Sequence, residues 1–493
     1  MNIEQLYQIF LSYNQKVCTD TRKIIPDSIF FALKGHNFDG NQFALQALQN
    51  GCAFAVIDNP EIAIQNEKCI LVENVLKTLQ QLATYHRQHL NIPILAITGS
   101  NGKTTTKELT TAVLSQKYKT HSTPGNLNNH IGVPLTLLQM TKEHEIAVIE
   151  LGANHPGEIQ ELCEIVLPNY GIITSIGKEH LEGFGNLMNV MKTNGELYNY
   201  LIRHNGKIFL QIDNTDLINT LGLFNISYKE ITHNQEKYIL YSTKQFFEEQ
   251  IDIQQTIQTI VLGEYIDEPT DIFVHLNWQT FNREKGYSPN YSIRTKLLAK
   301  HNFFNALAAV TAGIYFGVNA EQINDAISNY IPDKNRMQLV HTSKNNIVIL
   351  DAYNANPTSM MAALNFFKQK NILKVQNVAD SSNPTTTQNS KFSSNEKVLI
   401  LGDMFELGEH SEKEHIEILN WIVENFKEGM VFLIGKEFQN AIGKFSCPNN
   451  CQHYLSADDF ITTLKQGKIS LSDKFILIKA SRGMQLEKIV SYL

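Results

Sequence analysis

The chain has 493 residues, of which 43% are hydrophobic and 18% are charged, and its formal net charge is -7. This mild charge, with no basic face or tail in the sequence, argues against nucleic acid as a main partner. No stretch approaches the roughly 18 uninterrupted apolar residues of a membrane span, and the N-terminus MNIEQLYQIF lacks a signal pattern, so we expect no membrane span and a cytoplasmic protein.

Apolar segments of strand length alternate with helical patterns along most of the chain. Short runs rich in Val, Ile and Leu that are followed by helices predict an α/β fold with parallel sheets covered on both faces. The predicted strands are residues 92–98, 146–151, 170–176, 207–212, 347–351, 398–401, 431–434 and 475–479. No internal repeat is visible.

Two breaks in this pattern predict three domains, within the range expected for the length. Residues 1–90 form a small mixed α/β N-terminal domain that ends in a helix at 76–90. Residues 91–332 form a central parallel-sheet domain, and residues 333–493 form a C-terminal Rossmann-like α/β domain. The second boundary falls near Pro332, where NYIPDKNRM separates a helix from the next strand.

Two segments and the cysteines complete this outline. Residues 377–397 are rich in Ser, Thr, Asn and Gln, which predicts a flexible surface loop inside the third domain. For residues 228–295 we expect irregular strands and long loops. The six cysteines are scattered, and only Cys447 and Cys451 lie close together, so reduced structural thiols are expected.

The segment AITGSNGKTTTKEL, residues 96–109, joins a predicted buried strand to a helix through a turn of Gly, Ser and Asn. Backbone N–H groups and the helix dipole make such a junction an anion site. Lys103 adds a full positive charge, and the Thr104 hydroxyl is placed to ligate Mg²⁺. The loop is shorter than the generic phosphate loop, because Ile97 stands where the first glycine is expected.

We interpret this junction as a short phosphate loop for ATP, and a glycine turn followed by a capped helix is the alternative. The nucleotide contacts are expected from Gly99, Ser100, Asn101, Gly102, Lys103, Thr104 and Thr105.

The shortened loop TGSNGKTTT resembles that of the Mur ligase family, which joins amino acids or peptides to a carboxylate at the expense of ATP. Further segments with the same resemblance follow in chain order: STPGNLNNHIGVPLTLL, ELGANHPGEI, GKEHLEGFG, KHNFFNALAA, DAYNANPTSM, LGDMFELG and KASRGMQLE. The N-terminal DTRKIIPDSIFFALKGHNFDGNQF is similar to the segment that grips the UDP-sugar in members that add D-alanyl-D-alanine.

The resemblance implies a monomeric, ATP- and Mg²⁺-dependent ligase of peptidoglycan synthesis. It would add D-alanyl-D-alanine to UDP-N-acetylmuramoyl-tripeptide through an acyl phosphate. Another Mur ligase, a folylpolyglutamate synthase-like amino-acid ligase and a non-catalytic nucleotide-binding member are the alternatives.

Phosphoryl transfer needs positioning and positive charge more than covalent help from the protein. Lys103 is expected to face the β- and γ-phosphates. Glu150 ends a predicted strand, at the edge where parallel strands gather ligands. With Thr104, the resemblance implies Glu150 and His180 as metal ligands, although Mg²⁺ normally prefers oxygen. A solvated or capping role is the alternative for both residues.

The resemblance also implies nucleotide contacts from later segments. Asn305 would contact the adenine, Arg336 the phosphates from the third domain, and Asp351 the ribose. Asn302 lies on the same helical face as Asn305, and a helix cap is its alternative role. A purely structural turn is the alternative for residues 353–357. Contacts from two domains to one nucleotide imply closure around it.

The acceptor residues are assigned in three groups by the same resemblance, with ordinary surface polarity as the alternative for any one of them. Uridine and diphosphate contacts are expected from Asp20, Arg22, Ser28, Lys34, Phe38 and Asp39. The muramoyl part is expected at Thr123, Asn126 and Asn128. The D-alanyl-D-alanine site is expected near Asp403, Glu406 and Arg482.

One position departs from the family pattern. The family carries a lysine shortly after the histidine motif, normally carbamylated as an anionic ligand for a second Mg²⁺. In VMKTNGELY, Asn194 stands at that place, and Lys192 lies roughly 200° around a helix from it. A weakened or remodelled second metal site is one interpretation, and a benign variant or a slipped alignment is the other.

Overall fold

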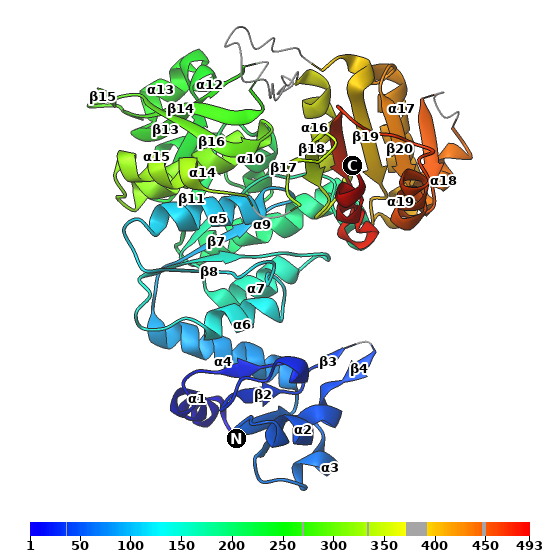
Figure 1. The fold of residues 1–493 in the computed structure, drawn as a ribbon. Coiled ribbons are helices and arrows are strands. Elements are labelled where there is room, and N and C mark those ends of the chain that lie inside the picture. The colour runs from blue at the N-terminus through cyan, green and yellow to red at the C-terminus, as the bar shows by residue number, and fades with distance from the viewer. Residues whose placement is uncertain (36, 269–270, 333–334, 371–391, 446–449) are drawn as a thin grey trace, which may run out of the picture.

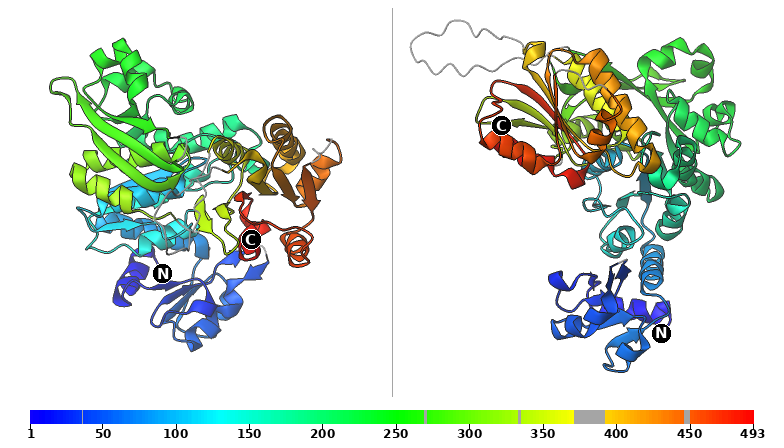
Figure 2. Two further views of the ribbon diagram at one scale, coloured as in Figure 1. Left: turned by 45° about the horizontal axis from the view of Figure 1, so that its top comes forward. Right: turned by 90° about the vertical axis from the view of Figure 1, so that its right-hand side faces the viewer.

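The structure is a computed structural model that describes residues 1–493 except 36, 269–270, 333–334, 371–391 and 446–449. Its described residues form three large sheets with helices on their faces and one two-stranded hairpin, and the N-terminal body, the central body and the C-terminal body follow each other along the chain (Figure 1). The central body lies between the other two, and the C-terminal body stands beside it (Figure 2). No described helix is long and apolar enough to cross a membrane.

The N-terminal body is a small parallel sheet in the order β1-β2-β5-β6. Its strands are β1 (Val17–Cys18), β2 (Ile29–Phe31), β5 (Phe54–Ile57) and β6 (Cys69–Leu71), and a separate hairpin is made by β3 (Lys34–Gly35) and β4 (Phe38–Asp39). Its helices are α1 (Ile3–Ser12), α2 (Ala44–Gln49), α3 (Pro60–Ala63) and α4 (Val75–Leu90).

Helix α4 joins the N-terminal and central bodies. The Asn74 side chain caps its start by accepting the Lys77 N–H at 2.8 Å, and Asn91 ends it in a left-handed conformation. One hydrophobic cluster runs from Phe31 of β2 through Leu82 of α4 to the central body. This shared core makes the helix at the predicted first domain boundary a packed connection.

The central body is built on a sheet of ten strands in the order β15-β14-β13-β12-β11-β10-β7-β9-β8, with β16 paired to β14. The strands that pair in parallel are β7 (Ile94–Thr98), β8 (Thr120–Ser122), β9 (Ile146–Glu150), β10 (Tyr170–Ile173), β11 (Lys207–Gln211), β12 (Tyr238–Thr243) and β13 (Thr259–Ile266). Antiparallel pairing adds β14 (Phe273–Asn282), β15 (Gly286–Tyr287) and β16 (Tyr291–Leu298).

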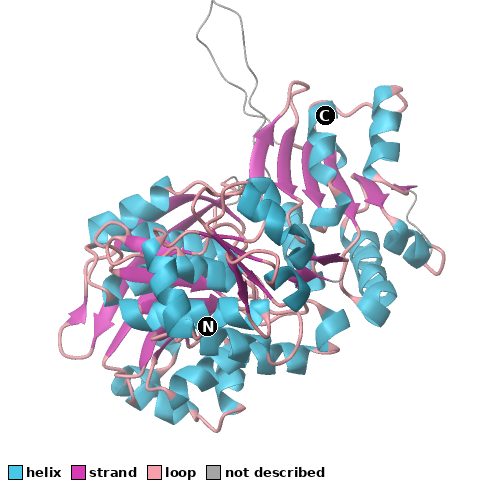
Figure 3. Ribbon diagram, turned by 90° about the horizontal axis from the view of Figure 1, so that it is seen from below, coloured by secondary structure: helices cyan, strands magenta, loops and turns pink. Residues whose placement is uncertain are grey.

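Helices cover the central sheet on both faces (Figure 3). Those packed through the cluster shared with α4 include α6 (Gly132–Leu138), α7 (Glu158–Val166), α9 (Leu187–Arg203) and α10 (Thr215–Gly222). The opposite face carries α5 (Lys103–Leu114), α14 (His301–Tyr315) and α15 (Ala320–Asn329). Short helices complete the body: α8 (Leu181–Phe184), α11 (Tyr228–His233), α12 (Lys244–Glu249) and α13 (Ile251–Thr256).

The prediction of irregular strands and long loops at 228–295 is wrong. Eight residues of β13 pair in register with β14, and β16 pairs with the other edge of β14. Along β14, Val274, Leu276 and Trp278 are buried, whereas His275 and Asn277 between them are only half-buried. This alternation is the signature of an antiparallel strand with one covered face. A prediction based on continuous apolar runs does not detect an alternating strand of this kind.

The C-terminal body is a sheet in the order β17-β18-β22-β19-β20-β21, parallel except for β17. Its strands are β17 (Gln338–His341), β18 (Ile347–Asp351), β19 (Lys397–Gly402), β20 (Met430–Ile434), β21 (Cys451–Tyr454) and β22 (Phe475–Lys479). Its helices are α16 (Pro357–Gln369), α17 (Ser411–Asn425), α18 (Lys436–Ile442) and α19 (Ala457–Lys465).

All eight predicted strands are strands in the structure, with ends that differ by up to three residues. The α/β class with a parallel central sheet is thereby confirmed. Most of the loop predicted at 377–397 lies outside the described residues, and within the described part Ser394–Glu396 is a single 3₁₀ turn that leads into β19. Cys447 also lies outside them, and Cys18, Cys52, Cys69 and Cys163 are free thiols.

Candidate active site

The phosphate loop lies at the carboxyl end of β7. Gly99 and Gly102 both have positive φ, 129° and 86°. A Cβ on Gly99 would lie 2.3 Å from Thr174 Oγ1, and one on Gly102 would lie 2.5 Å from Asn305 Oδ1. Both conformation and space therefore require glycine at these two positions. Because Gly102 precedes α5 without a side-chain cap, the first N–H groups of that helix are open to an anion.

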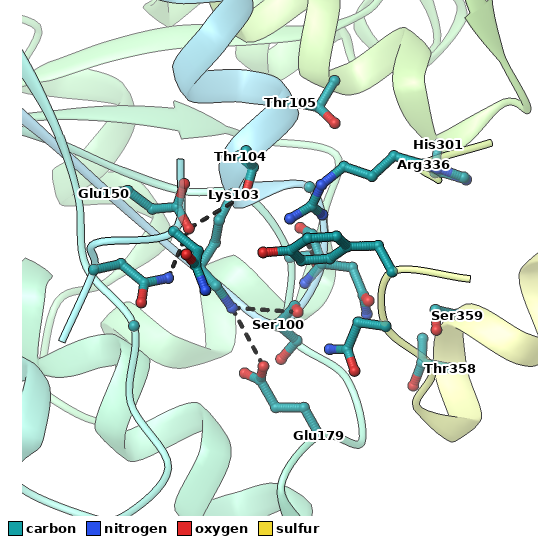
Figure 4. A pocket seen from close by; sticks show the side chains of 18 of the residues that line it. Ser100, Lys103, Thr104, Thr105, Glu150, Glu179, His301, Arg336, Thr358 and Ser359 are labelled. Carbon is teal, nitrogen blue, oxygen red and sulfur yellow. Dashed lines mark hydrogen bonds and ion pairs between the residues drawn. The ribbon is translucent and has the colours of Figure 1, made fainter. Parts of the chain in front are cut away.

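Lys103 is folded back over its own loop (Figure 4). Its ammonium donates to the carbonyl oxygen of Gly99 and, at 3.4 Å, to that of Ser100. It also forms an ion pair with Glu179, with 3.3 Å between Nζ and Oε2. The Lys103 ammonium is therefore already held by one carboxylate and two carbonyl oxygens.

Glu150 ends β9 beside the loop, and its side chain is almost completely buried. One carboxylate oxygen accepts from the Thr104 hydroxyl at 3.3 Å and from the Asn128 amide at 2.8 Å. The other, Oε2, is buried without a hydrogen-bond partner. A buried anionic oxygen without a partner is unfavourable unless a cation joins it, so the Thr104 and Glu150 oxygens fit a magnesium ion.

No group of three or more His, Cys, Asp or Glu residues in the described part of the chain could hold a metal ion by itself. Mg²⁺ is commonly held by one or two carboxylates together with substrate phosphates. The donor set of Thr104 and Glu150 matches that arrangement.

His180 lies at the start of α8 in a left-handed conformation, with φ of 44°. Its Nδ1 pairs with the Glu406 carboxylate of the C-terminal body, and its Nε2 lies 3.9 Å from Glu179 Oε2. The hydrogen bond from His180 lowers the pKa of Glu406. Of the residues predicted for D-alanyl-D-alanine, Glu406 is thus the one in direct contact with a predicted metal ligand.

Asn194, at the position that departs from the family pattern, is buried on α9. Its Oδ1 accepts from the Thr98 hydroxyl at 2.9 Å. Its Nδ2 donates to the Val190 carbonyl at 3.1 Å and to Glu179 Oε1 at 3.4 Å. The Asn194 amide is therefore a neutral link between the end of β7 and a second buried carboxylate.

Asn302 and Asn305 connect α14 to α5. Asn302 donates to the Leu298 carbonyl at 2.7 Å and accepts from Asn305 at 2.8 Å, while Asn305 accepts from the Thr106 hydroxyl at 3.1 Å. The alternative role of Asn302 as a helix cap is wrong, because Lys300 precedes the helix. The Asn305 side chain lies against Gly102 of the loop.

The C-terminal body supplies the other side of the cleft. The Arg336 guanidinium lies 3.7 Å from the centre of the Tyr353 ring, and that of Arg482 lies 5.0 Å from it. Asp351 and Lys479 end the neighbouring strands β18 and β22, and their Oδ2 and Nζ are 2.5 Å apart. Asp351, predicted for the ribose, is therefore already paired with a buried cation.

The turn at 353–357 combines a structural and a cleft role. Asn356 caps α16 by accepting the Ser359 N–H at 2.8 Å. Its amide also donates to Asn101 Oδ1 of the phosphate loop at 3.1 Å. A second link joins Lys178 to Glu414 at 2.7 Å. These contacts hold the C-terminal body against the phosphate loop.

A cavity of about 530 Å³ opens between the central and C-terminal bodies. The predicted site residues that line it are Ser100, Asn101, Gly102, Lys103, Thr104, Thr105, Asn126, Asn128, Glu150, His180, Asn302, Arg336 and Asp351. Residues that sequence reasoning missed also line it, among them Glu179, His301, Tyr353, Thr358 and Lys479. The sequence indicates two of these residues weakly: Glu179 directly precedes the predicted metal ligand His180, and Lys479 ends a predicted strand.

Other predicted residues do not line this cavity. Thr123 is buried and accepts the Glu150 N–H at 2.9 Å, so it holds the end of β9. Asp403 is buried with both oxygens on the N–H groups of Glu437 and Phe438, each at 3.0 Å, where it caps α18. Burial raises the pKa of Asp403.

The residues predicted for the UDP-sugar lie in the N-terminal body. Asp20 pairs with Arg22 at 2.8 Å, and the Arg22 hydrogen bond lowers the pKa of Asp20 to about 2. Lys34 pairs with Asp58 at 2.8 Å. Phe38 is 59% exposed on the β3–β4 hairpin.

The remaining two members of that group have structural partners. Asp39 accepts the Asn41 N–H at 2.9 Å, which starts a 3₁₀ helix. The Ser28 hydroxyl is fully buried, 3.4 Å from Cys52 Sγ. The Ser28 side chain therefore has no access to solvent.

Comparison with known proteins gives two family matches. The model of the Mur ligase middle domain matches residues 97–313, and that of the Mur ligase family catalytic domain matches residues 15–87. The UDP-N-acetylmuramoyl-tripeptide–D-alanyl-D-alanine ligase of Bacillus subtilis (strain 168) is 34% identical, over 97% of this chain and 92% of its own length. That of Escherichia coli (strain K12) is 31% identical, over 97% and 93%.

Solved structures agree. A crystal structure of MurF from Acinetobacter baumannii superposes with a TM-score of 0.75 at 27% identity, covering 98% of this chain and 96% of its own. The fold is also that of a MurF ligase from Thermotoga maritima in complex with ADP, with a TM-score of 0.73 at 20% identity over 97% of this chain and 96% of the other. The chain belongs to the Mur ligase family. Within that family, its place is among the MurF members.

Proposed function

We propose that this chain is an ATP-dependent ligase that joins D-alanyl-D-alanine to UDP-N-acetylmuramoyl-tripeptide, a step of peptidoglycan synthesis, and that it works as a cytoplasmic monomer with Mg²⁺. The observation that carries the proposal is the cavity itself. A phosphate loop with its lysine, a buried carboxylate with an unpartnered oxygen and a stacked arginine from a second body all face it. The curated names of the Bacillus subtilis and Escherichia coli relatives support the choice of substrates.

The reaction needs a better leaving group than oxide on the tripeptide carboxyl. A carboxylate oxygen attacks the γ-phosphorus of ATP, the bond to the β-phosphate oxygen breaks, and ADP leaves. The amine of D-alanyl-D-alanine then attacks the acyl carbon of the resulting acyl phosphate, loses a proton, and inorganic phosphate departs. Such transfers depend on positioning and on positive charge near the phosphoryl oxygens.

The chain's own residues fit these demands. Lys103 exchanges its loop carbonyls and Glu179 for phosphate oxygens, and Arg336 approaches from the opposite side, pre-oriented by Tyr353. Thr104 and Glu150 would hold the magnesium ion, which neutralises phosphate charge when bound. The hydrogen bond between Asn101 and Asn356 and the ion pair between Lys178 and Glu414 join the two bodies beside the loop, and closure there would exclude water from a hydrolysable intermediate.

The acceptor is expected to extend from this cavity towards the N-terminal body. Asn126 and Asn128 line the cavity at the border of the central body, and Asn128 also touches Glu150. The exposed ring of Phe38 and the charged side chain of Lys34, both on the β3–β4 hairpin, offer stacking and a cation of the kind that a uridine diphosphate binds.

A substrate panel tests the proposal against its alternatives. The purified chain is given Mg-ATP and UDP-N-acetylmuramoyl-tripeptide with D-alanyl-D-alanine, single amino acids or no amine, and products are identified by mass spectrometry. We expect one product, larger by the dipeptide less water, only with D-alanyl-D-alanine. Product with a single amino acid alone would instead assign another ligase activity. Nucleotide binding without any product would assign a non-catalytic role.

A further inference from the structure

Glu179 is a buried carboxylate that lines the cavity, and the proposed reaction gives it no role beyond its ion pair with Lys103. It lies between β10 and α8 and is 4% exposed. One of its oxygens lies 3.3 Å from the Lys103 ammonium, and the other accepts from the Asn194 amide at 3.4 Å. Burial of a carboxylate is unfavourable unless it is paired, and here the partner is the lysine that the nucleotide needs.

Bound nucleotide changes this balance of charge. When phosphate oxygens take the Lys103 ammonium, the buried Glu179 carboxylate loses its ion pair and faces added negative charge. Two anions close together in a medium of low dielectric repel strongly. A divalent cation between them removes that conflict. Glu150 lies on the other side of Lys103, and its unpartnered oxygen fits the first magnesium ion (Figure 4). The Glu179 carboxylate is therefore free to bind a second ion.

The surroundings of Glu179 suit a ligand whose position is fixed. Asn194 reaches it from α9, and that amide is itself held by the Thr98 hydroxyl at 2.9 Å and the Val190 carbonyl at 3.1 Å. Hydrogen bonds of this kind orient a metal-ligating carboxylate. His180 Nε2, also lining the cavity, lies 3.9 Å from Glu179 Oε2. Asn194 is neutral, so it supplies no charge to a metal ion itself. Its amide instead orients the negatively charged Glu179 carboxylate.

We propose that Glu179, positioned by Asn194, supplies the carboxylate for a second divalent cation at the nucleotide phosphates, so that this chain needs no carbamylated lysine. The inference rests on the proposed function, because it assumes a bound nucleoside triphosphate. Its consequence is that cation binding is independent of dissolved CO₂, which a lysine carbamate would require.

The test counts Mn²⁺ ions by electron paramagnetic resonance of the free ion, with the full chain and the non-hydrolysable ATP analogue AMP-PNP. We expect two Mn²⁺ per wild-type chain and one in Glu179→Gln, with AMP-PNP still bound. Glu182→Gln is the matched control, since Glu182 is an exposed residue nearby that does not line the cavity, and it should keep both ions. In turnover, Glu179→Gln should raise the Mg²⁺ concentration for half-maximal rate roughly 10- to 100-fold.

Three results would overturn the inference. The first is a wild-type chain that binds only one Mn²⁺, a result that requires no variant. Glu179→Gln could keep both ions and bind AMP-PNP more tightly, which would make Glu179 a restraint on Lys103 only. Removal of CO₂ and bicarbonate could abolish the second ion, which would point to a carbamylated lysine. Two ions without any ligated product would support this inference and overturn the proposed function.

Discussion

The pair of Asp351 and Lys479 gives a prediction whose magnitude follows from the structure. The two side chains end adjacent parallel strands, with 2.5 Å between Oδ2 and Nζ, and they are 15% and 2% exposed. At an effective dielectric constant of 20, their attraction is about 7 kcal/mol, most of which offsets desolvation. Removing one partner leaves a buried charge, and such losses run to about 3–5 kcal/mol.

We therefore expect Asp351→Ala to lower the free energy of unfolding of the C-terminal body by about 3–5 kcal/mol. With about 2–4 °C per kcal/mol for a body of this size, its thermal midpoint should fall by about 6–20 °C. The double variant Asp351→Ala/Lys479→Met should regain most of this, because no charge remains buried. Glu428→Ala, at an exposed position of the same body, is the control and should change little.

Thermal and urea unfolding, followed by circular dichroism without ligand, measure these changes separately from any loss of nucleotide binding. A loss below about 1 kcal/mol in Asp351→Ala would refute the reasoning. A double variant that is no more stable than the single one would refute it as well, since it would show that the isolated lysine is not the cause.

Three further predictions concern the loop, the cleft and pH. Gly102→Ala should weaken AMP-PNP binding more than about tenfold by calorimetry, because φ is positive and the new Cβ meets Asn305; unchanged binding would contradict this. Tyr353→Leu should lower kcat/KM for ATP roughly tenfold by removing the ring under Arg336, and an unaltered value would contradict this. Burial lowers the pKa of His86 in the folded chain below its usual 6.5. At a pH between the folded and the unfolded pKa the unfolded chain binds more protons, so the free energy of unfolding falls as pH drops through this range. The loss of stability in His86→Gln, measured in urea, should be smaller at pH 5 than at pH 7.5, and an equal loss at both would contradict the assignment.

The sequence is most informative where structure is local. The strand, turn and helix around Lys103 are set by neighbouring residues, so the phosphate loop could be predicted from one short segment. Glu150 could also be predicted, because residues at the carboxyl ends of parallel strands share one edge of the sheet. The strands β14 and β16 were missed because half-buried antiparallel strands alternate instead of forming continuous apolar runs.

The contacts that complete the site are long-range and have no local signature. Glu179 meets Lys103 from 76 positions away. The pairing of Asp351 with Lys479 depends on which strands become neighbours in the sheet. Asp403 and Glu406 lie three residues apart in one loop, yet the first caps a helix and the second reaches His180. Only the folded arrangement distinguishes them.

The central claim is that ATP activates the tripeptide carboxyl as an acyl phosphate, and an isotope experiment tests it most directly. The terminal carboxylate of UDP-N-acetylmuramoyl-tripeptide is labelled with ¹⁸O, and the chain turns it over with Mg-ATP and D-alanyl-D-alanine. Mass spectrometry of the released phosphate should find one ¹⁸O atom for each amide formed. Unlabelled phosphate alongside ligated product, or phosphate released without any product, would contradict the account.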